Sequence, residues 1–173
     1  MSSNWQDSAR ALFAKSPDFA GRILHDLLKA DLPPSIEYTL LTPLCGDEPY
    51  RDEDRVDDDG DDPYGEGDSA GARFDDPSGA PIPEMVILAG PASDPVRAII
   101  VEFLQGRDDT VRQRWPLYAA AIWLSHGCPV DLLVICSDEL TGHWADRPIA
   151  TALDGYVCRP NVLLLEDLGT IFT

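Results

Sequence analysis

Apolar residues recur at helical spacing through the first 30 residues of the chain. Intervals of three and four residues place side chains on one face of a helix, and Ser16-Pro17 separates two such stripes. Proline favours the first position of a helix, so the pattern predicts two N-terminal helices, the second ending near Ala30. The stripes consist of Trp5, Ala9, Leu12 and Phe13, followed by Phe19, Ile23, Leu24, Leu27 and Leu28.

Short apolar runs follow, and their length and β-branched content are typical of strands. Residues 84–89 and 97–104 are joined by a loop rich in Gly and Pro, which predicts an antiparallel hairpin. Residues 130–136 form a continuous apolar run, as expected of a strand buried on both faces. The other predicted elements are a strand over residues 36–42, a helix over 109–126, a short helix over 137–145 and a last strand over 156–165.

This order of elements predicts an α/β fold with a mixed sheet. The core reads α-β-β-β-α-β and is preceded by an N-terminal helix. With 173 residues and 44% hydrophobic content, the chain is long enough for one domain with a sizeable core, and we predict a single α/β domain over residues 1–173.

Residues 43–82 form a separate compositional block inside that domain. Positions 47–76 contain 14 acidic residues and three arginines, and so carry −11 of the formal charge of −18. Such a segment buries too little apolar surface to order itself, which predicts a disordered, solvated insertion. An acidic arm that mimics nucleic acid or covers the protein's own site is the alternative. The spacing misses the calcium-loop pattern.

The scarcity of basic residues and the spacing of the cysteines argue against two kinds of binding. Lysine occurs only at positions 15 and 29 and no basic cluster is present, so binding to a nucleic-acid backbone is disfavoured. Cys45, Cys128, Cys136 and Cys158 include no Cys-x-x-Cys pair, which argues against a zinc site. No signal peptide or membrane-length apolar run is found, so we expect a cytoplasmic location and no membrane contact.

Glu102 is the most informative single residue, because its strand is apolar on both faces. A buried carboxylate is costly unless a metal, a cation or a proton compensates it. If Ala89 lies opposite Arg97 in the hairpin, Glu84 falls opposite Glu102, with Cβ atoms about 5 Å apart. Mg²⁺ or Mn²⁺ would bridge two such acids and activate water. Glu84 as a surface acid at the start of a strand is the simpler interpretation.

Three stretches of the chain resemble known proteins. Residues 101–109, 114–119 and 128–138 resemble an actinobacterial group of uncharacterised proteins that is similar to the PD-(D/E)XK nuclease superfamily. The resemblance extends to residues 144–149 and 12–33, and so covers nearly the whole chain except the acidic block. It implies a restriction-endonuclease-like fold, in agreement with the element order predicted above.

The resemblance also assigns roles to individual residues. Glu84 and Glu102 match the two catalytic, metal-binding acids of the superfamily. Leu104 stands where the superfamily has Lys, and Val111 stands where relatives often carry a Lys in the next helix. Gln105 is adjacent but points to the opposite strand face. The motif is therefore degenerate, and only a cation from elsewhere could complete it. The candidates are Arg107, Arg112 and Arg114.

Two functions are consistent with these residues. The first is a catalytically degraded PD-(D/E)XK-like protein that acts as a binding or regulatory protein, with a protein partner or a second copy of itself. The second is a magnesium-dependent nuclease that hydrolyses DNA, with Glu84 and Glu102 as catalytic residues and metal ligands. Leu104 and the overall acidity favour the first.

Overall fold

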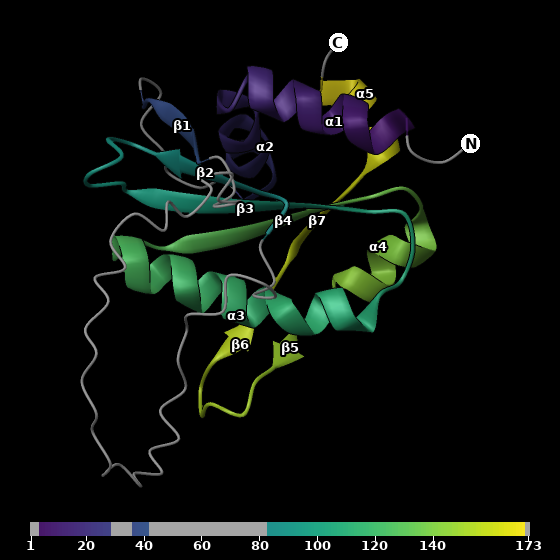
Figure 1. The fold of residues 1–173 in the computed structure, drawn as a ribbon. Coiled ribbons are helices and arrows are strands. Elements are labelled where there is room, and N and C mark those ends of the chain that lie inside the picture. The colour runs from purple at the N-terminus through teal and green to yellow at the C-terminus, as the bar shows by residue number, and fades with distance from the viewer. Residues whose placement is uncertain (1–3, 29–35, 42–82, 172–173) are drawn as a thin grey trace, which may run out of the picture. The chain divides into compact units, whose positions relative to one another are not determined.

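The computed structural model describes residues 4–28, 36–41 and 83–171. Within them lie five helices and seven strands (Figure 1). The insertion expected over residues 43–82 lies outside the described residues, as does Cys45. The elements are α1 (Asn4–Lys15), α2 (Asp18–Leu28), β1 (Tyr38–Leu41), β2 (Met85–Ala89), β3 (Arg97–Leu104), α3 (Asp109–His126), β4 (Val130–Cys136), α4 (Glu139–Ala145), β5 (Ile149–Ala150), β6 (Val157–Cys158), β7 (Asn161–Leu164) and α5 (Leu165–Ile171).

The main sheet has five strands in the order β1-β2-β3-β4-β7. Strands β1, β2 and β3 are antiparallel, whereas β4 runs parallel to β3 and β7 runs parallel to β4. The predicted α/β class with a mixed sheet is therefore confirmed. The predicted hairpin register is also confirmed, because Ala89 pairs with Arg97 and Met85 pairs with Val101.

Helices cover both faces of this sheet: α1, α2 and α5 lie over one face, and α3 and α4 lie over the other (Figure 1). Alternate residues of β3 serve the two apolar layers. Ile99, Val101 and Phe103 pack with α1 and α2, whereas Ile100 and Leu104 pack with α3. Both faces of β4 are buried in the same alternating way, as its continuous apolar run predicts.

Helix α3 has the bounds that the sequence predicts, and its ends explain why. The Asp108 carboxylate accepts hydrogen bonds from the backbone N–H groups of Thr110 and Val111, which are otherwise unpaired at a helix start. Gly127 ends the helix in the left-handed conformation at φ 67°, which a residue with a Cβ atom rarely adopts. No helix among the described residues is both long and apolar enough to cross a membrane.

The C-terminal part differs from the sequence prediction. A single strand over residues 156–165 is wrong, because the chain forms β6, breaks at Arg159-Pro160 and continues as β7. Pro160 has no N–H to donate to a strand ladder. Strand β6 pairs with β5 in a separate two-stranded hairpin, and α5 follows β7 directly. Two-residue strands and a seven-residue helix are too short to produce a recognisable hydrophobic period.

Candidate functional site

Glu102 lies where β3 extends beyond its neighbour β2. The antiparallel ladder ends at the pair Met85–Val101, so residues 102–104 have no β2 partner, although they still pair with β4. Glu102 shares a strand face with Ile100 and Leu104, and its side chain therefore points toward α3. Only 3% of Glu102 is exposed, which confirms the burial that the apolar strand predicts.

Glu84 lies beside Glu102, as the register predicts, but it meets Glu102 through its backbone. The Glu84 N–H donates a hydrogen bond of 3.0 Å to Oε1 of Glu102. Glu84 is the last residue before β2, so its amide is free to turn toward this carboxylate instead of entering the ladder. A charge-assisted bond to a backbone amide stabilises the ionised form of a buried acid. The sequence alone did not predict this contact.

The Glu84 carboxylate is paired with Arg10 of α1. Oε2 of Glu84 lies 3.1 Å from both Nε and NH2 of Arg10, and 29% of the Glu84 side chain is exposed. The Arg10 guanidinium also stacks over the Phe103 ring, 5.9 Å from its centroid. Next to it, Gln6 donates a 3.1 Å hydrogen bond to the Phe103 carbonyl. Helix α1 thus supplies a cation and a donor at the end of β3 that β2 does not reach.

Burial dominates the ionisation of Glu102. Removal from water raises the pKa of its carboxyl from 4.5 to about 7. The hydrogen bond from the Glu84 amide lowers this pKa, the Glu84 carboxylate raises it, and Arg10 lowers it. Glu102 therefore exchanges its proton near neutral pH, and the surrounding charges only partly offset its loss of hydration.

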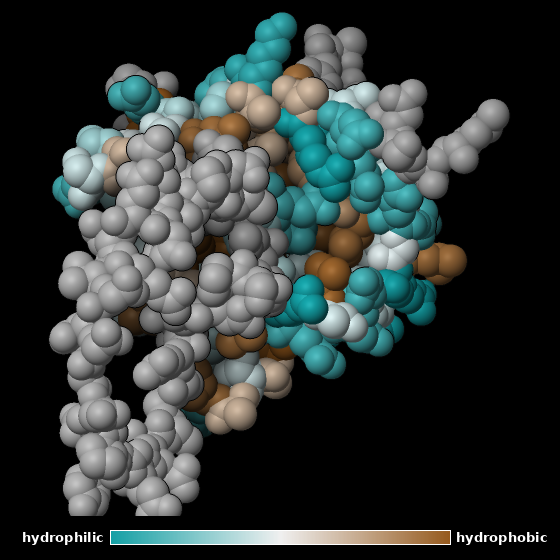
Figure 2. Space-filling view, viewed as in Figure 1, coloured by the Kyte–Doolittle hydropathy of each residue, from teal (hydrophilic) through white to brown (hydrophobic). Residues whose placement is uncertain are grey.

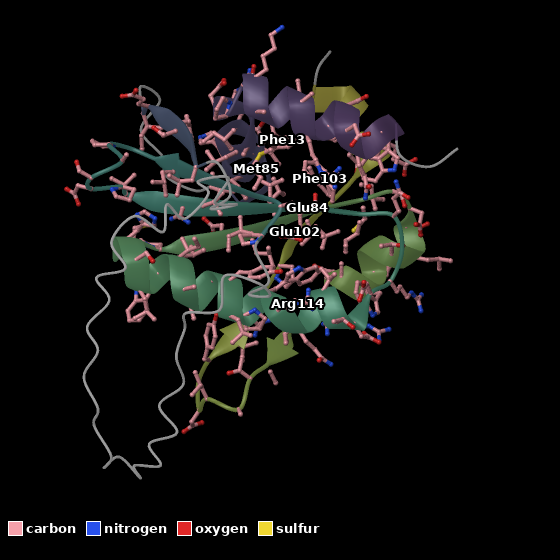
Figure 3. The ribbon with its side chains drawn as sticks, viewed as in Figure 1. Phe13, Glu84, Met85, Glu102, Phe103 and Arg114 are labelled. Carbon is pink, nitrogen blue, oxygen red and sulfur yellow. The ribbon has the colours of Figure 1, made fainter. Side chains whose placement is uncertain are left out.

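Helix α3 covers the side of the sheet toward which Glu102 points, and it carries Arg114 (Figure 3). Tyr118 is a buried residue of the same helix. The pKa of Tyr118 is raised, first by burial and then by the charge of Glu102, whereas the neighbouring Arg114 lowers it. The phenol hydroxyl therefore lies within electrostatic reach of both the carboxylate and the guanidinium. Of the three arginines considered from the sequence, Arg114 is the one whose charge acts on this cluster.

The other positions suggested by the resemblance lie elsewhere. Leu104 is buried in the apolar cluster under α3, and Val111 packs partly against the same cluster. Arg112 donates to the Arg147 carbonyl and stacks over Trp144, 5.6 Å from the ring centroid. Arg107 and Gln105 are exposed in the turn after β3. None of these side chains is among the groups that shift the pKa of Glu102, which are Glu84 and Arg10.

Glu84 and Glu102 are the neighbouring acids at this site that could share a cation. Among the described residues, no three His, Cys, Asp or Glu side chains form a group that could hold a metal. In that same part of the chain, one oxygen of each carboxylate, Oε1 of Glu84 and Oε2 of Glu102, has no hydrogen-bond partner. A metal bound here would have two protein oxygens and would take its other ligands from water or substrate.

Sequence reasoning did not identify Arg10, Gln6 and Tyr118. Arg10 and Gln6 lie on a helix that is remote in sequence from β3, and only the docking of α1 brings them to it. One signal was available: Arg10 is a cation between apolar positions of an amphipathic helix, and a buried acid needs such a partner. Tyr118 is a buried residue of α3, and its position near Glu102 was not predicted.

The described cysteines and histidines form no metal-binding group. Cys128, Cys136 and Cys158 are free, buried thiols. His25, His126 and His143 lie on three different helices and form no cluster.

No protein-family model, curated protein or solved structure matches the chain.

Proposed function

We propose that this chain is a binding or regulatory protein built on a restriction-endonuclease-like core whose former catalytic acids are now held by protein partners. One observation carries the proposal: both acids already have protein partners. Glu102 accepts the backbone N–H of Glu84, and the Glu84 carboxylate pairs with Arg10. These contacts do what a metal would do at a working site, namely compensate two neighbouring negative charges.

The order of elements supports the choice of core. Helix α2 is followed by the antiparallel strands β1, β2 and β3, then by α3 and by β4 parallel to β3. This is the α-β-β-β-α-β arrangement that the sequence resemblance implies, with α1 as the preceding helix. Glu84 directly precedes β2 and Glu102 lies near the end of β3, and these positions support the proposal because the resemblance expects its two acids there.

The loss of the lysine position supports a loss of catalysis. Leu104 is 6% exposed and lies among apolar side chains under α3, so it can neither orient water nor stabilise developing charge. Arg114 is the nearest cation from α3, and its charge acts on the Tyr118 phenol. A nuclease would need at least one group that contacts the reacting phosphate.

The charge supports a protein partner over nucleic acid. The formal charge of the chain is −18, and three of the described arginines, Arg10, Arg22 and Arg97, are already in ion pairs. A protein that neutralises several phosphates normally presents a cluster of unpaired Lys and Arg side chains.

A magnesium- or manganese-dependent nuclease is the second candidate, favoured by the two carboxylate oxygens without partners, Oε1 of Glu84 and Oε2 of Glu102, within the described residues. Calorimetry with Mg²⁺ and Mn²⁺ separates the two functions. For the native protein we expect no binding at millimolar metal and no cleavage of single- or double-stranded DNA.

The matched variants are Glu102→Gln, which keeps the acceptor for the Glu84 amide, and Glu139→Gln, which removes an exposed acid on α4. Metal binding that disappears in Glu102→Gln but persists in Glu139→Gln, together with metal-dependent DNA cleavage, would overturn the proposal in favour of the nuclease.

A further inference from the structure

A hollow opens between α3 and the β5–β6 hairpin, away from the Glu102 cluster. It has a volume of about 460 Å³, and its walls are mainly apolar. Small-molecule sites typically enclose about 300–1,000 Å³ within apolar and aromatic walls that carry a few polar groups. Trp123 and Leu153 line it although they are 57% and 67% exposed, so large apolar side chains here face open space.

A second hollow of about 390 Å³ continues along α3. The two hollows share Ala120, Leu153 and Tyr156, and the second is also lined by Leu117 and Ile149. Figure 2 shows brown, apolar side chains where Figure 1 draws the β5–β6 hairpin. The two hollows together form an elongated apolar groove, which we call the α3 groove.

The segment after β5 that lines the α3 groove is hydrogen-bonded to α3. The Tyr156 hydroxyl donates a 3.0 Å hydrogen bond to the Pro116 carbonyl of α3. The loop that carries Tyr156 is closed on itself, because the Thr151 hydroxyl donates to the Tyr156 carbonyl at 2.8 Å. The groove is therefore built by specific contacts between the hairpin and the helix.

Among the described residues, Arg159 is the one charged residue that lines either hollow. It is exposed, and within the described part of the chain its guanidinium has no ion pair or hydrogen bond. An unpaired guanidinium at one end of an apolar groove recognises a planar anion, and a carboxylate matches its fork of donors.

We propose that the α3 groove binds an unbranched acyl chain that ends in a carboxylate. The carboxylate pairs with Arg159, and the chain runs past Ala120 and Tyr156 into the second hollow. Two hollows that share part of their lining accommodate an extended chain, their apolar walls select hydrocarbon, and Arg159 selects the charge of the head group. The inference does not depend on Glu84 and Glu102, so it can fail or hold independently of the function proposed above.

Calorimetry with decanoate tests the proposal, with decan-1-ol and decylamine as ligands of equal chain length but different charge. All are used below their micelle concentration and without added metal. We expect decanoate to bind at one site, and decylamine to bind at least about tenfold more weakly, since a charged hydrogen-bonded pair contributes more than a factor of ten in affinity.

Two variants with matched controls locate the site. Arg159→Gln is expected to weaken decanoate binding about tenfold and leave decan-1-ol binding unchanged, whereas Arg107→Gln, an exposed arginine outside the groove, changes neither. Ala120→Trp fills the wall that both hollows share and is expected to abolish binding. Ala121→Trp adds the same bulk to an exposed position outside the lining and is expected to leave binding intact.

Circular dichroism melting of each variant confirms that it is folded before its binding is interpreted. The proposal is overturned if decanoate does not bind the native protein, if decanoate and decan-1-ol bind equally, or if Arg159→Gln binds decanoate as the native protein does. It is also overturned if the native protein is a dimer that Ala120→Trp converts to a monomer, because the groove would then be covered by a second copy.

Discussion

Glu102 is a carboxylate that lies almost entirely out of water among neighbouring protein groups. Its neighbours are the backbone N–H of Glu84, the Arg10 guanidinium that pairs with the Glu84 carboxylate, and the Tyr118 phenol on α3. These groups do not fully replace hydration, so the carboxyl binds a proton more tightly than an exposed one. The free-energy cost of burying the Glu102 side chain therefore depends on pH.

The pKa of Glu102 predicts that the protein loses stability as the pH rises toward neutrality. In the unfolded chain the carboxyl loses its proton near pH 4.5, whereas the folded protein keeps it until about pH 7. The folded state therefore binds more protons in this window, and the free energy of unfolding falls as pH rises, by up to about 3 kcal/mol.

Denaturant unfolding of the native protein and Glu102→Gln between pH 4 and 8 measures this effect. The difference in unfolding free energy between the two proteins should change across that range, to the advantage of Glu102→Gln at high pH. Glu166→Gln, an exposed acid on α5, serves as the control. A difference that stays constant with pH would show that Glu102 titrates like an exposed acid.

Arg10 is predicted to tune that titration. Its charge lowers the pKa of Glu102, so Arg10→Gln should move the pH-dependent loss of stability to higher pH. The ion pair with Glu84 is partly exposed, and its direct contribution to stability is expected to be only about 0.5–1 kcal/mol.

Arg22→Gln provides a matched control for Arg10→Gln. Arg22 also forms an ion pair and stacks over a phenylalanine ring, but on α2, with Asp18 and Phe19 as its partners. Stability–pH curves of both variants should differ in midpoint only for Arg10→Gln. An equal shift in both would mean that net charge, and not proximity, sets the pKa.

At the scale of elements, the packing of α2 against β1 depends on the absence of a side chain at Gly21. A Cβ atom added there would lie 2.1 Å from the Tyr38 hydroxyl and 2.2 Å from the adjacent ring carbon. Gly21 lies within helix α2, where alanine is intrinsically the better residue by about 1 kcal/mol. The close contact with Tyr38 therefore favours glycine at this position, whereas helix propensity favours alanine.

Gly21→Ala is predicted to lower the melting temperature, because displacement of the Tyr38 ring costs about 1–3 kcal/mol and outweighs the gain in propensity. Gly106→Ala is the control, since a Cβ atom there meets nothing within 4 Å. Shortening the tyrosine in Gly21→Ala/Tyr38→Val should recover part of the lost stability. If Gly21→Ala melts at or above the native temperature, the close approach of α2 and β1 is not rigid.

The elements show how far the sequence determines the fold. The apolar runs and the loop between them were sufficient to predict the register of β2 and β3, because pairing the two runs symmetrically about the loop places Ala89 opposite Arg97. That register placed Glu84 next to Glu102. The register could not specify which atoms of Glu84 and Glu102 are in contact. The Glu84 carboxylate pairs with Arg10 on α1, and the position of α1 depends on tertiary packing.

At the scale of the whole molecule, two apolar layers enclose the sheet and three of the four cysteines. Cys136 is the most deeply placed, and burial raises the pKa of its thiol to about 12. The thiolate is the reactive form of cysteine, so both the burial of Cys136 and the high pKa of its thiol slow its reaction with alkylating reagents.

Alkylation with iodoacetamide at pH 8, followed by mass spectrometry, tests the integrity of this core. Cys136 is predicted to be modified only at the rate of global unfolding, and a low concentration of denaturant should accelerate its modification in parallel with the loss of stability. Cys158, which lines the α3 groove, is the internal comparison and should react earlier. Fast modification of Cys136 in the native protein would contradict a closed core.

The overhang of β3 beyond β2 has an evolutionary consequence. The ladder that sets the hairpin register ends at Met85–Val101, one residue before Glu102. Exchanges at Glu102 and Leu104 therefore leave every pair of that ladder in place. The proposed loss of a metal site would therefore leave the register of the hairpin intact. At this end of the sheet, a change of side chain alters local charge and packing but not which strand residues of β2 and β3 are paired.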